Sequence, residues 1–185
     1  MDWVNKHLQI VPINTFIDPI FPVENAIITH AHADHAKPGH NNVLATKHTI
    51  EIMKIRYGEN CANNFQELSF NSPLNINDVK VTFFPAGHIL GSAQVLLEYQ
   101  KDKINFTGDF KITKDDTCEN FRPVTCDTLV TEATFGLPIF QHPDPEVEIN
   151  KLINSLKNFS NRPHLIGVYA LGKAQRLMKL LRNKG

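Results

Sequence analysis

Short apolar runs separated by polar turns occupy the first two thirds of the chain and predict β-strands. The runs 7–12 and 15–18 flank Asn14 and predict two paired strands joined by a turn. Residues 47–57 instead follow a helical pattern that stops at Gly58. The other predicted strands span residues 26–29, 43–46, 79–84, 94–99, 103–106 and 128–132.

The last third of the chain is more helical. Residues 143–159 place apolar side chains at near-helical spacing, with acidic residues in the first turn, which predicts an amphipathic helix. Residues 165–169 predict an apolar strand, and residues 172–183 predict a basic amphipathic helix. Strands followed by strands mixed with helices predict an α/β layered domain.

Composition is that of an ordinary globular protein, with 42% hydrophobic and 21% charged residues in a chain of 185. No apolar run approaches the ~20 residues of a membrane span, and the N-terminus shows no secretory signal. The three cysteines lack Cys-x-x-Cys spacing and predict reduced thiols rather than a disulfide framework. We therefore expect a cytoplasmic protein that does not associate with a membrane.

The charge balance narrows the possible functions. Nineteen basic residues offset nineteen acidic ones, which argues against a protein that simply coats nucleic acid. A nuclease remains compatible with this balance, because bound metal ions can supply positive charge where a phosphate must lie.

One six-residue segment, His30-Ala-His32-Ala-Asp34-His35, gathers three imidazoles and a carboxylate directly after a predicted strand. Imidazole nitrogens and carboxylate oxygens are typical ligands of Zn²⁺, Mn²⁺ or Fe. His30 and His32 should share a face because alternate residues of an extended segment do, while Asp34 and His35 lie beyond the bend. The segment therefore predicts ligands for two adjacent metals, the alternative being a His-rich surface loop.

Two further residues end predicted strands and complete the pattern. His88 lies in Pro-Ala-Gly-His-Ile-Leu-Gly, and Asp109 lies in Phe-Thr-Gly-Asp-Phe. Alone, such a histidine is usually structural and such an aspartate usually forms a turn. Beside the histidine segment we expect His88 to be a ligand and Asp109 to bridge two metals roughly 3.5–4 Å apart.

In this order the residues resemble the metallo-β-lactamase superfamily, and further segments resemble its β-CASP nuclease branch. Within that branch the chain looks most like the bacterial ligase-associated DNA exonucleases, from about Asp18 to its C-terminus. The segments that carry the resemblance are Ile17-Asp-Pro19, 28–36, 86–94, Asp116-Thr-Cys118, Thr131-Glu-Ala-Thr-Phe-Gly136 with Leu137-Pro138, and Tyr169-Ala-Leu-Gly-Lys-Ala-Gln175.

The resemblance implies a role for each site residue. His30, His32 and His88 would hold one divalent metal, Asp34 and His35 would hold a second, and Asp109 would bridge them. Zn²⁺ is the first expectation for both ions, with Mn or Fe as alternatives. Asp34 would also orient the attacking hydroxide.

The resemblance gives two more carboxylates a supporting part. Asp18 and Glu132 would steer ligands or relay protons. The alternatives are a turn cap for Asp18 and an ordinary ion pair for Glu132.

Nucleic acid is the partner that the resemblance implies, DNA before RNA, with a functional link to a DNA ligase. Lys173 and Arg176, with Lys179 and Arg182, could approach its backbone, although a solvated helix face is the alternative for most of them.

The implied fold is an α/β domain of the αββα metallo-β-lactamase type, incomplete here. Residues 1–160 would form its N-terminal part, and residues 161–185 would lead into a β-CASP insertion. Most of that insertion and the C-terminal return are expected to be missing, and with the return a further histidine of the second site.

Four functions stay open. The first is a metal-dependent DNA exonuclease or its N-terminal portion, and the second is an RNA-processing β-CASP nuclease. The third is a small-molecule metallo-hydrolase, which the segments 131–136 and 171–175 disfavour. The fourth is an inactive remnant of a truncated gene.

Overall fold

The computed structural model describes residues 3–184. These residues form two compact units, the first ending at Glu132 and the second beginning at Ala133. The expected division of the chain into residues 1–160 and 161–185 stays a prediction. Within residues 3–184, no helix has the length and apolar character that crossing a membrane requires.

The first sheet has the strand order β1-β2-β3-β4-β5, and only β1 and β2 pair antiparallel. A short 3-10 turn, Val11–Ile13, and the left-handed Asn14 at φ 45° connect β1 to β2, so the predicted strand pair around Asn14 is confirmed. The strands are β1 (Gln9–Ile10), β2 (Thr15–Ile17), β3 (Asn25–Ile27), β4 (His40–Ala45) and β5 (Ala62–Glu67).

The second sheet has the order β10-β9-β8-β7-β6, in which only β9 and β10 pair parallel. The hairpin predicted across residues 100–102 is confirmed, with Tyr99 opposite Asp102 and Val95 opposite Phe106. The strands are β6 (Pro73–Ile76), β7 (Val79–Pro85), β8 (Ala93–Tyr99), β9 (Asp102–Phe106) and β10 (Thr128–Val130).

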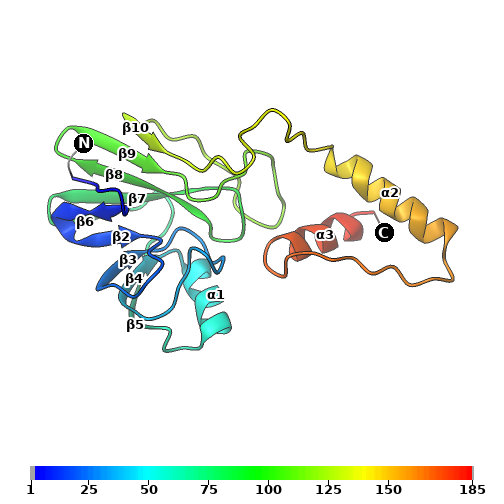
Figure 1. Cartoon of the computed structure of the whole chain (residues 1–185), viewed down its shortest axis with the longest axis horizontal. Coiled ribbons are helices and arrows are strands. Elements are labelled where there is room, and N and C mark those ends of the chain that lie inside the picture. The colour runs from blue at the N-terminus through cyan, green and yellow to red at the C-terminus, as the bar shows by residue number, and fades with distance from the viewer. Residues whose placement is uncertain (1–2, 185) are drawn as a thin grey trace. The chain divides into compact units, whose positions relative to one another are not determined.

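Helix α1 (Lys47–Tyr57) has the bounds that the sequence predicts. Thr46 caps it, because its side chain accepts a hydrogen bond from the Thr49 backbone N–H, and Gly58 at φ 91° ends it. Figure 1 shows α1 beside β4 and β5. Ile50 and Met53 of α1 pack there against the first sheet, in one cluster with Val43 and Ala45 of β4.

The main core fills the space between the two sheets. Ile27 and Leu44 of the first sheet pack in one cluster with Phe83, Val95 and Ile104 of the second. Residues 3–132 thus form three layers, helix on sheet on sheet, because each sheet must bury its apolar face. The α/β layered domain that the sequence predicts is confirmed.

Removing the Phe83 ring should test this core. Phe83 is fully buried, and replacing it by Ala is expected to lower the free energy of unfolding by about 3–5 kcal/mol. Phe21→Ala is the matched control, because Phe21 is 61% exposed. Urea unfolding followed by the fluorescence of Trp3, which packs in the same cluster, measures both. Equal losses for the two variants would contradict this core.

The second unit contains α2 (Pro145–Asn158) and α3 (Lys173–Arg182), close to the predicted helices. Asp144 caps α2 by accepting a hydrogen bond from the Glu146 backbone N–H. The strand predicted at 165–169 is wrong: residues 133–184 contain no strand with which it could pair, and Leu165 is 97% exposed.

Candidate metal centre

The candidate site lies where strands of both sheets end. In the second sheet β7, β9 and β10 run in the same direction, so the segments that follow them leave the same edge. His88 follows β7, Asp109 follows β9 and Glu132 follows β10. The first sheet joins this edge after β3, where the Ala93 backbone N–H donates to the Thr29 carbonyl at 2.8 Å.

The histidine segment is a tight turn rather than a free loop. The backbone N–H groups of His35 and Ala36 both donate to the His32 carbonyl, at 3.1 and 2.8 Å. From α1, the Arg56 guanidinium donates to the Ala31 carbonyl at 2.8 Å. The backbone between His30 and His32 is therefore fixed from two directions.

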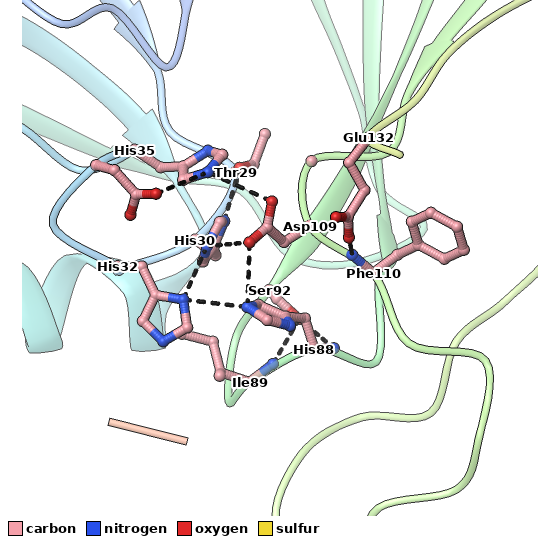
Figure 2. Close-up of polar contacts among 12 residues, drawn as sticks. Thr29, His30, His32, His35, His88, Ile89, Ser92, Asp109, Phe110 and Glu132 are labelled. Carbon is pink, nitrogen blue, oxygen red and sulfur yellow. Dashed lines mark hydrogen bonds and ion pairs between the residues drawn. The ribbon is translucent and has the colours of Figure 1, made fainter. Parts of the chain in front are cut away.

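Four side chains converge on one point (Figure 2). His32 Nδ1 lies 3.2 Å from His30 Nε2 and 3.1 Å from His88 Nε2. Asp109 Oδ2 lies 3.7 Å from His30 Nε2 and 3.4 Å from His88 Nε2. His30 is fully buried, whereas His88 and Asp109 are each about a quarter exposed.

These separations suit a tetrahedral ion. Metal–nitrogen and metal–oxygen bonds of ~2.0–2.2 Å place tetrahedral ligand atoms about 3.3–3.6 Å apart, and the four distances above lie between 3.1 and 3.7 Å. The imidazole nitrogens of His30, His32 and His88 also face one another, and too few protons lie between them for every contact to be a hydrogen bond. The donor set therefore fits a divalent metal.

A second group of donors lies on the other side of Asp109. His35 Nε2 lies 3.4 Å from Asp109 Oδ1 and 3.8 Å from Asp34 Oδ2. Asp109 thus directs one carboxylate oxygen to each group, which is the geometry that bridging requires. Asp34 is 80% exposed, and it belongs to neither group of side chains whose ligand atoms lie within 4.8 Å of one another.

Asp18 lies behind the second group rather than in it. Its Oδ2 accepts from His35 Nδ1 at 2.8 Å and from the Thr29 hydroxyl at 2.6 Å, while its Oδ1 accepts from the Thr29 backbone N–H at 2.7 Å. Asp18, His30 and His35 also form a possible ligand group by distance. Because its oxygens are already used, we assign Asp18 to orienting His35, so that His35 Nε2 faces Asp109.

Glu132 supports Asp109 through the backbone. Its Oε1 accepts a hydrogen bond from the N–H of Phe110, the residue after Asp109, at 3.0 Å (Figure 2). Its negative charge also acts on the His88 ring. This contact suits a carboxylate that steers a ligand.

The segment around His88 depends on two small residues. The Ser92 hydroxyl oxygen accepts from the backbone N–H groups of His88 and Ile89, at 3.0 and 3.2 Å. Gly87 has φ 73°, and a Cβ there would lie 2.3 Å from the Lys111 carbonyl oxygen. Only glycine lets this turn approach the segment after β9 so closely.

Charge in the cluster is unevenly distributed in the absence of a metal ion. Burial lowers the pKa of His30 to about 2, and burial also lowers the pKa of His88. Burial acts to lower the pKa of His35 as well, but hydrogen bonds to Asp109 and Asp18 outweigh it and raise that pKa to about 10. The hydrogen bond from His35 lowers the pKa of Asp109 to about 2.

These pKa shifts predict that the His30 and His88 group and the His35 group would bind a metal with different pH dependence. Near neutral pH, His30 and His88 are already neutral, but His35 must lose a proton before Nε2 can bind a metal. Binding at the second position should release about one proton, and its affinity should rise roughly tenfold per pH unit up to about pH 10. Calorimetry in buffers of different ionisation enthalpy measures the release. Equal proton release at both positions would contradict this assignment.

Other candidates lie in the second unit. Lys173 and Arg176 are on α3, with Lys173 Nζ 4.6 Å from the Tyr169 ring centroid, and their contact with nucleic acid stays a prediction. His142 packs edge-on against Phe135, and His164 hydrogen-bonds the Ser155 hydroxyl at 3.0 Å. Each of these histidines thus makes a local contact within the unit.

Sequence reasoning missed three supporting residues. Thr29, Ser92 and Phe110 each contact a site residue or its backbone. Ser92 and Phe110 lie within a few residues of His88 and Asp109. That proximity was the available signal, but hydroxyls and backbone N–H groups are too common in a sequence to single these residues out.

A family model and several known proteins match the sequence of this chain. A family model described as "Beta-lactamase superfamily domain" matches residues 2–146. The chain is 30% identical over 179 residues to a "Probable DNA ligase" of Opitutus terrae, covering 92% of this chain and 17% of that protein. It is 29% identical over 195 residues to "Endoribonuclease ysh-1" of Neurospora crassa, covering 86% and 23%.

Two further proteins are similar. "Cleavage and polyadenylation specificity factor subunit 3" of Dictyostelium discoideum is 34% identical over 121 residues, covering 63% of this chain and 15% of that one. A solved structure of an Enterococcus faecalis protein of unknown function has a TM-score of 0.60 at 16% identity, covering 89% and 45%, and it shows the fold alone. The chain spans less than a quarter of these three curated relatives, 17%, 23% and 15%.

The family implies binding of divalent metal, and the His30, His32, His88 and Asp109 cluster could hold one. The fold, the family match and the relatives all support the family that the order of the sequence motifs indicates. This chain belongs to the metallo-β-lactamase superfamily and, within it, to the β-CASP branch.

Proposed function

We propose that this chain provides the two-metal site of a nuclease that hydrolyses phosphodiester bonds, with DNA ends as the first substrate. The observation that carries the proposal is the shared carboxylate of Asp109. Its two oxygens face His30 and His88 on one side and His35 on the other. Two ions sharing such a carboxylate would suit in-line displacement at phosphorus.

Each residue then has a chemical part. His30, His32 and His88 would hold one ion, Asp34 and His35 the other, and Asp109 both. Bound Zn²⁺, or Mn or Fe, would lower the pKa of a water toward ~7 and offset the charge of the phosphate. Asp34, exposed beside His35, can accept a hydrogen bond from the attacking water and orient it. Asp18 and Glu132 keep His35 and the Asp109 segment in place.

The relatives support nucleic acid as the substrate class. One carries a DNA ligase name, two carry endoribonuclease or polyadenylation-factor names, and the DNA ligase relative is the one matched over 92% of this chain. RNA is therefore the second candidate, and a functional link to DNA ligation accompanies the first.

A cleavage assay tests the proposal. The 185-residue protein, supplied with Zn²⁺ or Mn²⁺, is mixed with single- and double-stranded DNA and RNA of equal length, labelled at either end. We expect metal-dependent shortening of DNA from an end, abolished by a chelator and by His32→Ala. Cleavage of RNA alone would replace the first candidate by the second. Metal-loaded protein that cuts neither polymer would overturn nuclease activity for this chain.

A further inference from the structure

The Thr29 hydroxyl lies between a carboxylate and the most deeply buried histidine of the metal cluster. Its Oγ1 is 2.6 Å from Asp18 Oδ2 and 3.1 Å from His30 Nδ1. Thr29 is 1% exposed and His30 is fully buried, so bulk water has little access to this contact. A hydrogen-bond partner that is lost here has no ready replacement.

The direction of these hydrogen bonds follows from the chemistry of each group. A carboxylate only accepts, and Asp18 Oδ2 accepts from both Thr29 Oγ1–H and His35 Nδ1–H. The hydroxyl has one proton, which is used toward Asp18, so its oxygen must accept from His30 Nδ1–H. His30 is thereby assigned the tautomer whose Nε2 lone pair faces His32 and Asp109.

We propose that Thr29 is a positioning residue that fixes the tautomer and ring orientation of His30 for the metal. The Asp18 carboxylate orients His30 by way of the Thr29 hydroxyl and orients His35 directly. It therefore acts on one histidine of each proposed metal position. This inference rests on the proposed metal centre and adds to it a residue that touches no metal.

Local backbone geometry is built around this contact. Asp18 adopts a left-handed φ of 44°, with its N–H donating to the Ile27 carbonyl at 2.9 Å. Gly108, next to Asp109, packs so tightly that a Cβ there would lie 2.8 Å from Thr29 Oγ1. The segment that carries Asp109 thus packs directly on the hydroxyl that orients His30.

A pair of substitutions separates the hydroxyl from the shape of the side chain. Thr29→Val keeps the branched shape and removes the hydroxyl, whereas Thr29→Ser keeps the hydroxyl. In zinc titrations against a competing chelator, Thr29→Val should weaken zinc binding at the position that His30 would hold about 10–100-fold, and Thr29→Ser should stay close to the wild type. Thr82→Val, at a buried threonine of β7, controls for the loss of a threonine hydroxyl from the fold.

Nuclear magnetic resonance of the zinc-loaded protein gives a second readout, which reports the His30 tautomer directly. Long-range nitrogen–proton spectra should show His30 protonated at Nδ1, with a proton protected from exchange. Thr29→Val should lose that protection while keeping the folded spectrum elsewhere.

The outcomes are distinct. Wild-type zinc affinity in Thr29→Val, equal losses in the Val and Ser variants, or a His30 Nδ1 without a proton would each overturn the role of Thr29. A wild-type protein that binds no zinc would instead overturn the metal centre itself.

Discussion

Replacing Asp109 by asparagine is expected to lower phosphodiester hydrolysis by at least ~100-fold and to release the second metal, because supporting contacts alone are worth about 10–100-fold in affinity. Asparagine keeps the size of the side chain but offers one oxygen where the carboxylate directs Oδ2 to His30 and His88 and Oδ1 to His35. The ratio of metal to protein, measured by mass spectrometry of the metals, should fall from two toward one.

The same substitution should change His35 even without metal. The hydrogen bond to Asp109 raises the pKa of His35, so that pKa should fall well below about 10 in Asp109→Asn. Asp116→Asn, in the same segment and about half exposed, is the control and should leave metal and activity unchanged. Two metals and full activity in Asp109→Asn would exclude a bridging role.

Replacing His32 by alanine is expected to weaken the first metal position by more than ~100-fold and to abolish hydrolysis. His32 Nδ1 is the donor that lies 3.2 Å from His30 Nε2 and 3.1 Å from His88 Nε2. Without it, three ligands remain and the tetrahedral set is broken. Zinc titration with a chromophoric chelator measures the loss.

The control for this prediction is His48→Ala. His48 lies on α1, is 42% exposed and pairs with Glu51, so its loss should not change zinc affinity. If His32→Ala kept wild-type affinity while His48→Ala lost it, the ligands would have been placed in the wrong part of the chain.

Much of the site could be predicted because its residues end strands. The predicted strands 26–29, 79–84 and 103–106 lie close to β3, β7 and β9, and the segments that follow them carry His30, His88 and Asp109. A strand pattern fixes where a chain leaves the sheet, and a ligand motif shows what is delivered there. The convergence of His88 and Asp109 follows from the common direction of β7 and β9.

The contacts that orient the ligands could not be predicted. Asp18 and Thr29 are eleven residues apart, and only the parallel pairing of β2 with β3 brings them together. Glu132 contacts the Phe110 backbone for a similar reason, since β10 pairs parallel with β9. Sequence suggested that these carboxylates support ligands without showing which atoms they hold.

Two strands were missed, and one was predicted in error, for physical reasons. β5 (Ala62–Glu67) is an edge strand whose exposed polar residues show little alternation, and β6 (Pro73–Ile76) is a short edge strand. β5 leaves no alternating apolar pattern, and β6 alternates over only four residues, with Leu74 and Ile76 partly buried against the core, which is too short a run to stand out in the sequence. Conversely, the apolar run 165–169 indicates hydrophobicity but not a pairing partner.

The metal content of the purified protein tests the central claim most directly. The 185-residue chain, purified without chelators, loaded with excess Zn²⁺ and passed through a desalting column, is measured for metal per chain. The site geometry predicts about two ions at pH ~8, with the His35 position emptying first as the pH falls. A protein that retains no divalent metal under these conditions would contradict the metal centre.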